Sequence, residues 1–139
     1  MTASAVRMGI ALLRAGRPVR IDGPVPTAVL SVETATADLL GLLDPDRKAK
    51  LMISGERAAA LNLANERDAA DPAAPVVLGS EDWLDAEKAM AIADPGRDLD
   101  RAPVGPLHPV APDCAETGRA ALDLARAAGL LPALWLLDP

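Results

Sequence analysis

The sequence predicts a single α/β domain of the layered α+β kind, in which a sheet is flanked by helices. The chain has 139 residues, a usual length for one domain. Half of its residues are apolar, which is enough to form one sizeable core. Segments with the apolar spacing of helices alternate with short apolar segments that are typical of strands. We therefore expect residues 1–139 to fold as one domain.

The first half of the chain opens with an amphipathic helix. Val6, Ile10 and Leu13 recur at helical spacing over 3–15, and Gly16 is a typical helix-ending residue. The other elements expected here are strands over 18–22, 27–33 and 51–53, a helix over 37–43 that Thr36 caps, and a helix that Ser54 caps and that runs through Leu63.

The second half is expected to hold two helices separated by a proline-rich segment. The first spans 81–93 with Ser80 as its N-cap, and the segment 94–112 carries too many prolines for a regular helix. The second spans 115–128 and ends at Gly129. The inward stripe of the first helix is expected to be Trp83, Ala86, Met90 and Ala93, and the remaining elements are a loop over 65–75 and strands over 76–78 and 132–137.

Composition argues against several classes of function. The net charge is −6, no basic stripe is visible, and Phe and Tyr are absent, so nucleic-acid binding is not expected. The single cysteine, Cys114, cannot form an internal disulfide, which fits a reducing compartment. The N-terminus lacks the features of a signal peptide, and no stretch reaches the ~20 apolar residues of a membrane helix. We expect a cytoplasmic protein with no membrane partner.

The residues that carry chemistry form no complete site. His108 and Cys114 are a conceivable nucleophilic pair, but a loop histidine and a half-buried thiol is the favoured interpretation. The helix start at Gly55–Arg57 is a possible anion site, although a capped surface helix is favoured. A solvated acidic face is likewise favoured over a cation site for the carboxylates Glu81, Asp82, Asp85 and Glu87. We therefore expect no catalytic residue, no metal ligand and no bound cofactor.

Several segments, in order along the chain, resemble one known family. They are 91–95 (Ala-Ile-Ala-Asp-Pro), 105–109 (Gly-Pro-Leu-His-Pro), 120–129 and 131–133, with weaker matches at 11–19, 33–36 and 51–58. In this order they resemble 3,4-dihydroxy-2-butanone 4-phosphate synthase, a lyase that acts on ribulose 5-phosphate in riboflavin biosynthesis. The resemblance implies a mixed sheet with flanking helices, here shortened. It also implies a dimer with Mg²⁺ sites at the interface.

The departures from that family fall on its active site. The acidic loop of the family is reduced here to a stretch that begins at Asp22 and has no glutamate. Its metal-binding histidine corresponds to Thr117, and its catalytic glutamate corresponds to Arg119. The reaction needs a metal to stabilise an enediolate, together with a general acid and base. The resemblance therefore implies that Asp22, Thr117 and Arg119 mark a vestigial site, in which Arg119 is a possible anion-binding residue.

Degenerate domains of this kind resemble the N-terminal portion of some GTP cyclohydrolase II proteins. The second half of those proteins holds a zinc ion on three cysteines, which the single cysteine here cannot supply. The expected function is thus a non-catalytic structural or regulatory domain of riboflavin biosynthesis. It would act as a homodimer or with a fused or associated GTP cyclohydrolase II domain. The alternatives are a divergent active lyase and a module that binds a phosphate ligand.

Overall fold

The computed structural model describes residues 2–99 and 105–137. Its elements in chain order are α1 (Ala3–Arg14), β1 (Val19–Ile21), β2 (Thr27–Ser31), α2 (Ala37–Leu43), β3 (Lys50–Ile53), α3 (Gly55–Ala60), the short 3₁₀ turn η1 (Arg67–Ala69), β4 (Val76–Leu78), α4 (Ala86–Ala93), the 3₁₀ turn η2 (Pro95–Arg97), β5 (Pro109–Val110), α5 (Ala115–Ala127) and β6 (Ala133–Leu137). The expected layered domain of helices and sheet is confirmed. No helix within the described ranges is long and apolar enough to cross a membrane.

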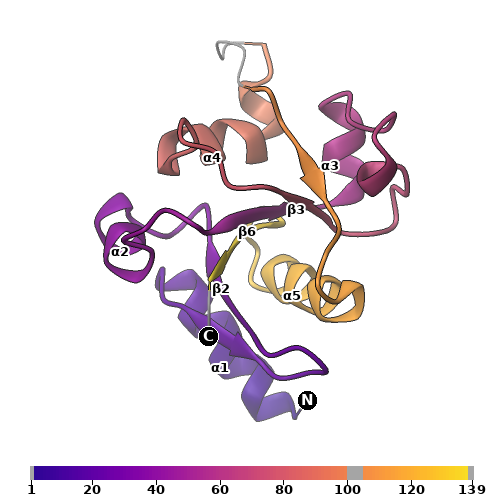
Figure 1. Cartoon of the computed structure of the whole chain (residues 1–139). Coiled ribbons are helices and arrows are strands. Elements are labelled where there is room, and N and C mark those ends of the chain that lie inside the picture. Colours follow the sequence, from indigo (N-terminus) through magenta and orange to yellow (C-terminus); the bar gives the residue numbers. More distant parts are fainter. Residues whose placement is uncertain (1, 100–104, 138–139) are drawn as a thin grey trace.

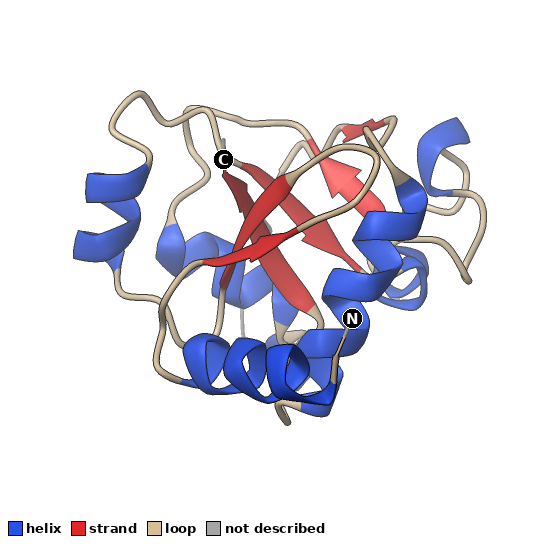
Figure 2. Cartoon of the chain, turned by 90° about the horizontal axis from the view of Figure 1, so that it is seen from below, coloured by secondary structure: helices blue, strands red, loops and turns tan. Residues whose placement is uncertain are grey.

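The sheet has six strands in the order β1-β2-β6-β3-β4-β5, and all five pairings are antiparallel. The expectation of a mixed sheet is therefore wrong. The sheet is antiparallel throughout because of the position of β6, which pairs with β2 on one side and with β3 on the other. The strands β2 and β3, joined through α2, run in the same direction, but the last strand lies between them and opposes both. The sheet is visibly twisted (Figure 2).

Helices cover both faces of the sheet and create two apolar layers. Figure 1 shows α1 and α5 on one side of β3 and β6, and α3 and α4 on the other. Strand residues alternate between the layers, so Leu51 packs toward α3 and α4 whereas Met52 packs toward α5. The α1–α5 contact is close, because a Cβ atom on Gly9 would lie 3.0 Å from the Leu124 side chain. The four inner strands β2, β6, β3 and β4 thus contribute to both cores.

The expected helix boundaries hold where a local cap decides them. Thr36 accepts a hydrogen bond from the Leu39 N–H, and Ser54 accepts one from the Arg57 N–H. Gly16 adopts a positive φ of 72° and ends α1 as expected, since an L-residue is strained there. The helix after Ser54 is shorter than expected: it stops at Ala60, and Asn62 turns the chain with a φ of 64°.

The start of α4 differs from the sequence expectation. The helix begins at Ala86 rather than at residue 81, and Asp85 rather than Ser80 caps it. The Asp85 carboxylate accepts the Lys88 N–H at 2.9 Å, and this hydrogen bond is the main reason that the pKa of Asp85 lies below its ordinary value. Residues 81–84 instead form a turn that buries Leu84.

The inward face of α4 shifts as a consequence. The buried residues of the helix are Ala89, Ile92 and Ala93, so Ala93 is the only buried member of the expected stripe. Trp83 lies outside the helix and, like Met90, is partly buried against the same core. The proline-rich segment also contains the two-residue strand β5, which extends the sheet beyond β4. Of this segment, residues 100–104 lie outside the described residues.

Candidate functional site

The connector between β1 and β2 lies against the first turn of α5. A Cβ atom on Gly23 would lie 2.8 Å from the Thr117 Oγ1. The segment that begins at Asp22 and the helix that carries Thr117 are therefore neighbours, although they are far apart in the sequence. These are the two segments in which the family resemblance locates its metal site. Their proximity defines the candidate site.

A pocket of about 350 Å³ opens beside Thr117. Its lining comes from the β1–β2 connector, from strands β2, β3, β4 and β6, and from the start of α5. The polar members are Thr27, Lys48, Lys50, Asp113, Cys114 and Thr117, and the larger apolar members are Val25, Pro26, Val29, Met52, Val77, Leu136 and Leu137. The pocket thus has a charged part and an apolar floor. A volume of this size is at the lower end of small-molecule sites.

Thr117 is buried, and its hydroxyl donates a hydrogen bond to the Cys114 Sγ at 3.3 Å. This hydrogen bond is the main reason that the pKa of the Cys114 thiol lies below its ordinary value. Cys114 also occupies the N-cap position of α5 without bonding a backbone N–H through its side chain. The thiol of Cys114, with its lowered pKa, therefore lies at the N-terminal end of α5.

Asp22 does not face this pocket as a ligand would. Its carboxylate lies 3.4 Å from the Arg20 Nε, and both side chains are largely exposed to solvent. The Mg²⁺ ion that the resemblance implies does not fit the residues present. The pocket offers a threonine hydroxyl already engaged with Cys114, one exposed aspartate and two lysine ammonium groups, which repel a divalent cation.

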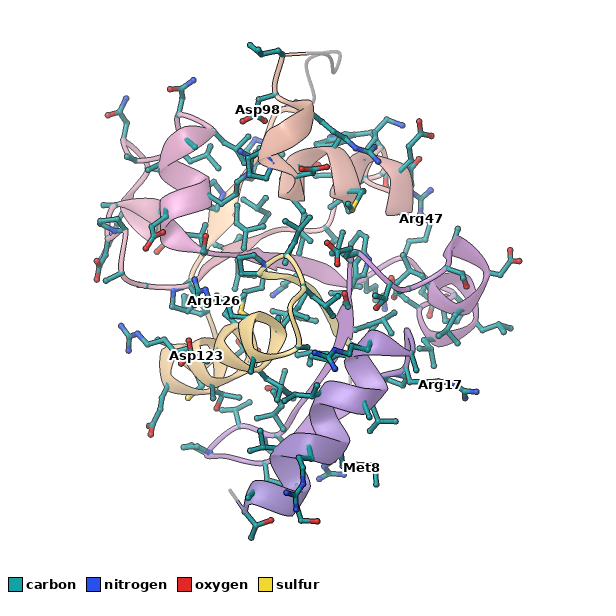
Figure 3. The ribbon with its side chains drawn as sticks, turned by 180° about the vertical axis from the view of Figure 1, so that it is seen from behind. Met8, Arg17, Arg47, Asp98, Asp123 and Arg126 are labelled. Atoms are coloured by element: carbon teal, nitrogen blue, oxygen red, sulfur yellow. The ribbon has the colours of Figure 1, made fainter. Side chains whose placement is uncertain are left out.

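Arg119 is separated from Thr117 by the geometry of the helix. Two positions along α5 correspond to a rotation of about 200°, so the two side chains leave on different faces. Arg119 is exposed and lines a different cavity, together with Glu56, Asp123 and Arg126. Asp123 pairs with Arg126 at 3.1 Å, as the labelled side chains in Figure 3 illustrate. The structure therefore does not assemble the three vestigial positions into one site.

His108 and Cys114 have separate partners. The His108 Nδ1 lies 2.5 Å from the Glu81 Oε1, and the Cys114 thiol contacts Thr117. His108 is not among the residues that line the pocket. The other carboxylates near Glu81 are also dispersed, since Asp85 caps α4 and pairs with Lys88. Among the described residues, no three His, Cys, Asp or Glu side chains are grouped as metal ligands would be.

The helix start at Gly55 is closed by backbone oxygens. A Cβ atom on Gly55 would lie 2.6 Å from the carbonyl oxygens of Asp71, Pro72 and Ala74. These oxygens carry partial negative charge, so they disfavour an anion at the position that the sequence suggested. Gly55 serves the close approach of the 65–75 loop to α3 instead.

Lys48 and Lys50 were missed by reasoning from the sequence. The strand expected at 51–53 in fact begins at Lys50, which shares the face of Met52 because side chains alternate along a strand. The alternation itself was available as a signal, since Lys50 and Met52 are two residues apart. No signal in the sequence indicated that these lysines line the same pocket as the start of α5, because that arrangement depends on the non-local pairing of β3 with β6.

No protein-family model matches this chain, and no curated protein matches it significantly in sequence.

Proposed function

We propose that this chain is a non-catalytic domain of riboflavin biosynthesis, structural or regulatory in role, of the kind that the resemblance to degenerate 3,4-dihydroxy-2-butanone 4-phosphate synthase domains implies. One observation carries the proposal: the pocket beside Thr117 and the β1–β2 connector contains two lysine ammonium groups where that chemistry needs a divalent cation. Positive charge at this place opposes metal binding. Arg119, on another face of α5, adds no acid or base to the pocket.

The partner that the proposal requires is a GTP cyclohydrolase II domain, fused to this chain or associated with it, or a second copy of the chain. A zinc ion would belong to that cyclohydrolase partner. In this role the chain would stabilise or assemble the enzyme rather than supply reacting groups. The exposed leucines of α2, Leu42 and Leu43, provide apolar surface outside the two cores, as a partner contact requires.

The direct test is a lyase assay of the purified chain with ribulose 5-phosphate and Mg²⁺ or Mn²⁺. We expect no formation of the four-carbon phosphate above the protein-free blank, and no rise in melting temperature with either cation. Metal binding could fail because the lysines repel the cation or because the pocket lacks metal ligands. A variant that carries both Lys48→Gln and Lys50→Gln separates these two causes. If charge alone excluded the metal, this variant would gain a cation-dependent thermal shift. Turnover by the unaltered chain that a chelator abolishes would overturn the proposal and identify a divergent lyase.

The second test addresses the role itself. The chain is co-expressed with a GTP cyclohydrolase II domain, and the melting temperature and oligomeric size of that domain are measured with and without it. We expect a higher melting temperature or a larger assembly in its presence. A cyclohydrolase that shows the same stability, size and turnover in both samples would contradict a structural or regulatory role.

A further inference from the structure

The sheet presents one row of residues to the pocket. In the strand register Val29 lies opposite Leu136, and Leu136 lies opposite Lys50, so the three side chains share one face. Met52, two residues beyond Lys50, extends the same face and belongs to the core beneath α5. The floor of the pocket is therefore apolar at its centre and ends at the ammonium group of Lys50.

A second lysine is delivered to the pocket by the turn after α2. The Asp44 carboxylate accepts the backbone N–H groups of Lys48 and Ala49 at 2.8 and 3.0 Å, which fixes the turn that leads into β3. Lys48 and Lys50 both line the pocket. Two of the three lysines in a chain of net charge −6 thus meet at one cavity.

Neither of these two ammonium groups is neutralised by an ion pair within residues 2–99 and 105–137. The third lysine, Lys88, differs in this respect, because it pairs with Asp85 at 3.3 Å on the outer face of α4. The pocket lining also contains the carboxylate of Asp113, which is exposed. Lys48 and Lys50 are therefore available to an anion that enters the pocket.

The start of α5 adds to this positive potential. The helix has 13 residues, and the side chain of its N-cap residue, Cys114, leaves the first N–H groups without a side-chain acceptor. Such groups carry partial positive charge and attract anions. Thr117 and Gly118, in the first turn, line the same pocket as the lysines. Two independent sources of positive potential thus meet over one apolar floor.

We propose that this pocket is a binding site for a small organic anion that has an apolar body. The anionic group, a phosphate or carboxylate, would lie between Lys48, Lys50 and the start of α5. The apolar body would rest on Leu136 and Val25, which are accessible apolar side chains of the lining, because Val29 and Met52 beneath them are buried. This site differs from the one expected at Arg119, which opens onto another cavity whose lining includes Glu56 and Asp123. The proposed site does not rest on the proposed function. Binding of an anion in this pocket can be measured whether or not the chain has lyase activity.

Phenyl phosphate is a suitable probe, because it joins an apolar ring to a dianion. Its binding is followed by amide chemical shifts in ¹⁵N-labelled protein, beside phenol and inorganic phosphate. We expect saturable shifts at Thr117, Gly118 and Lys50 with phenyl phosphate, and at least about tenfold weaker binding of phenol. Equal binding of phenol and phenyl phosphate, or shifts centred on Arg119, would overturn the proposal.

Substitutions of single lysines show which ammonium groups contribute to anion binding. Lys48→Gln and Lys50→Gln should each weaken phenyl phosphate binding by about fivefold, as expected for single exposed charges at the mouth of the pocket. Lys88→Gln is the matched control, since it removes the same charge from a paired lysine on α4, and it should leave the affinity unchanged. An equal effect of all three substitutions would mean that net charge alone acts, and would contradict the site.

The single cysteine provides a readout that needs no added ligand. Iodoacetate and iodoacetamide both alkylate a thiolate with loss of iodide, but only iodoacetate is an anion. We expect the ratio of their rates at Cys114 to exceed the ratio for a small free thiol, because the pocket concentrates the anionic reagent. The double variant Lys48→Gln/Lys50→Gln should return the ratio to that of the free thiol. An unchanged ratio in the double variant would overturn the proposal.

Discussion

At the scale of single residues, Arg57 has the most complete set of polar contacts in the described structure. Its guanidinium donates two hydrogen bonds to the Asp98 carboxylate at 2.8 and 2.6 Å, and its Nε donates to the Ile92 carbonyl at 2.7 Å. The side chain is 7% exposed. Arg57 thereby joins α3 to the end of α4 and to the segment that follows it, where Figure 3 labels Asp98.

Replacing Arg57 should therefore destabilise the fold. We expect Arg57→Ala to lower the free energy of unfolding by about 2–3 kcal/mol, because it removes the hydrogen bonds that the buried guanidinium donates to the Ile92 carbonyl and the Asp98 carboxylate. Arg57→Lys should recover only part of this loss, since an ammonium group cannot form the bidentate pair of hydrogen bonds that the guanidinium donates to the Asp98 carboxylate. Urea unfolding followed by tryptophan fluorescence measures both values.

The matched control for this prediction is Arg126→Ala. Arg126 also pairs with an aspartate, but the pair lies on the outer surface of α5, with side chains 46% and 74% exposed. Exposed pairs contribute little, so we expect a change of about 0.5 kcal/mol or less. If the two substitutions cost the same, burial would not determine the contribution of Arg57.

The Cys114 thiol should react at lower pH than an ordinary cysteine. Its pKa is lowered chiefly by the hydroxyl of Thr117, so more thiolate is present at neutral pH in the folded chain than in the unfolded one. We expect the pH midpoint of alkylation by neutral iodoacetamide to fall below that of the urea-unfolded protein. Thr117→Val should raise the midpoint.

Thr27→Val serves as the control for this pH profile. Thr27 lines the same pocket, but its hydroxyl donates to the Val25 carbonyl rather than to the thiol. The alkylation midpoint should therefore stay where it is in the unaltered protein. A midpoint that rises equally in both variants would show that the pocket as a whole, and not the Thr117 hydroxyl, sets the pKa.

At the scale of elements, two glycines in helices should respond in opposite ways to a methyl group. A Cβ atom on Gly41 in α2 meets nothing within 4 Å, whereas one on Gly55 in α3 meets three carbonyl oxygens at 2.6 Å. We expect Gly41→Ala to stabilise the protein by about 0.5–1 kcal/mol through helix propensity. Gly55→Ala should destabilise it despite the same gain in propensity, because the 71–74 backbone must move.

Thermal unfolding of the two variants beside the unaltered protein measures both effects. The melting temperature should rise for Gly41→Ala and fall for Gly55→Ala. The same exchange in two helices thus isolates the packing of α3 against the 65–75 loop. A rise in both variants would mean that this loop yields without cost.

The element boundaries show what local sequence decides. Thr36 and Ser54 were predicted as caps because the hydrogen bond that each accepts comes from three residues along the chain. The start of α4 was mispredicted because Ser80 and Asp85 are both suitable caps. Asp85 prevails in the fold, where the Arg47 guanidinium donates to the Leu84 carbonyl at 3.0 Å and holds the preceding turn. That contact joins residues far apart in the sequence.

The candidate site was predictable only in part for the same reason. Thr117 was singled out from the sequence, and the structure places it next to Gly23, in the connector that follows Asp22. Arg119 was assigned to the same site from a linear comparison, which ignores the rotation between positions on a helix. Lys48 and Lys50 enter the pocket through the pairing of β3 with β6, and no local pattern specifies that pairing.

At the scale of the whole molecule, the two apolar layers should unfold together. Leu51 and Met52 are adjacent on β3 and fully buried, yet they belong to opposite cores. Both tryptophans report on one layer only: Trp135 belongs to the core of α3 and α4, and Trp83 packs against it. The fluorescence of these tryptophans therefore tests whether damage to the other layer is felt across the sheet.

We expect Leu51→Ala and Met52→Ala each to reduce the free energy of unfolding by about 2–5 kcal/mol, because each leaves a cavity in a packed core. In urea, the tryptophan transition should move to lower concentration in both variants and coincide with the transition seen by far-UV circular dichroism. The strands are shared by the two layers, so neither core can persist without them. A Met52→Ala protein whose tryptophan transition stayed in place while its circular dichroism transition split in two would show that the layers unfold as separate units.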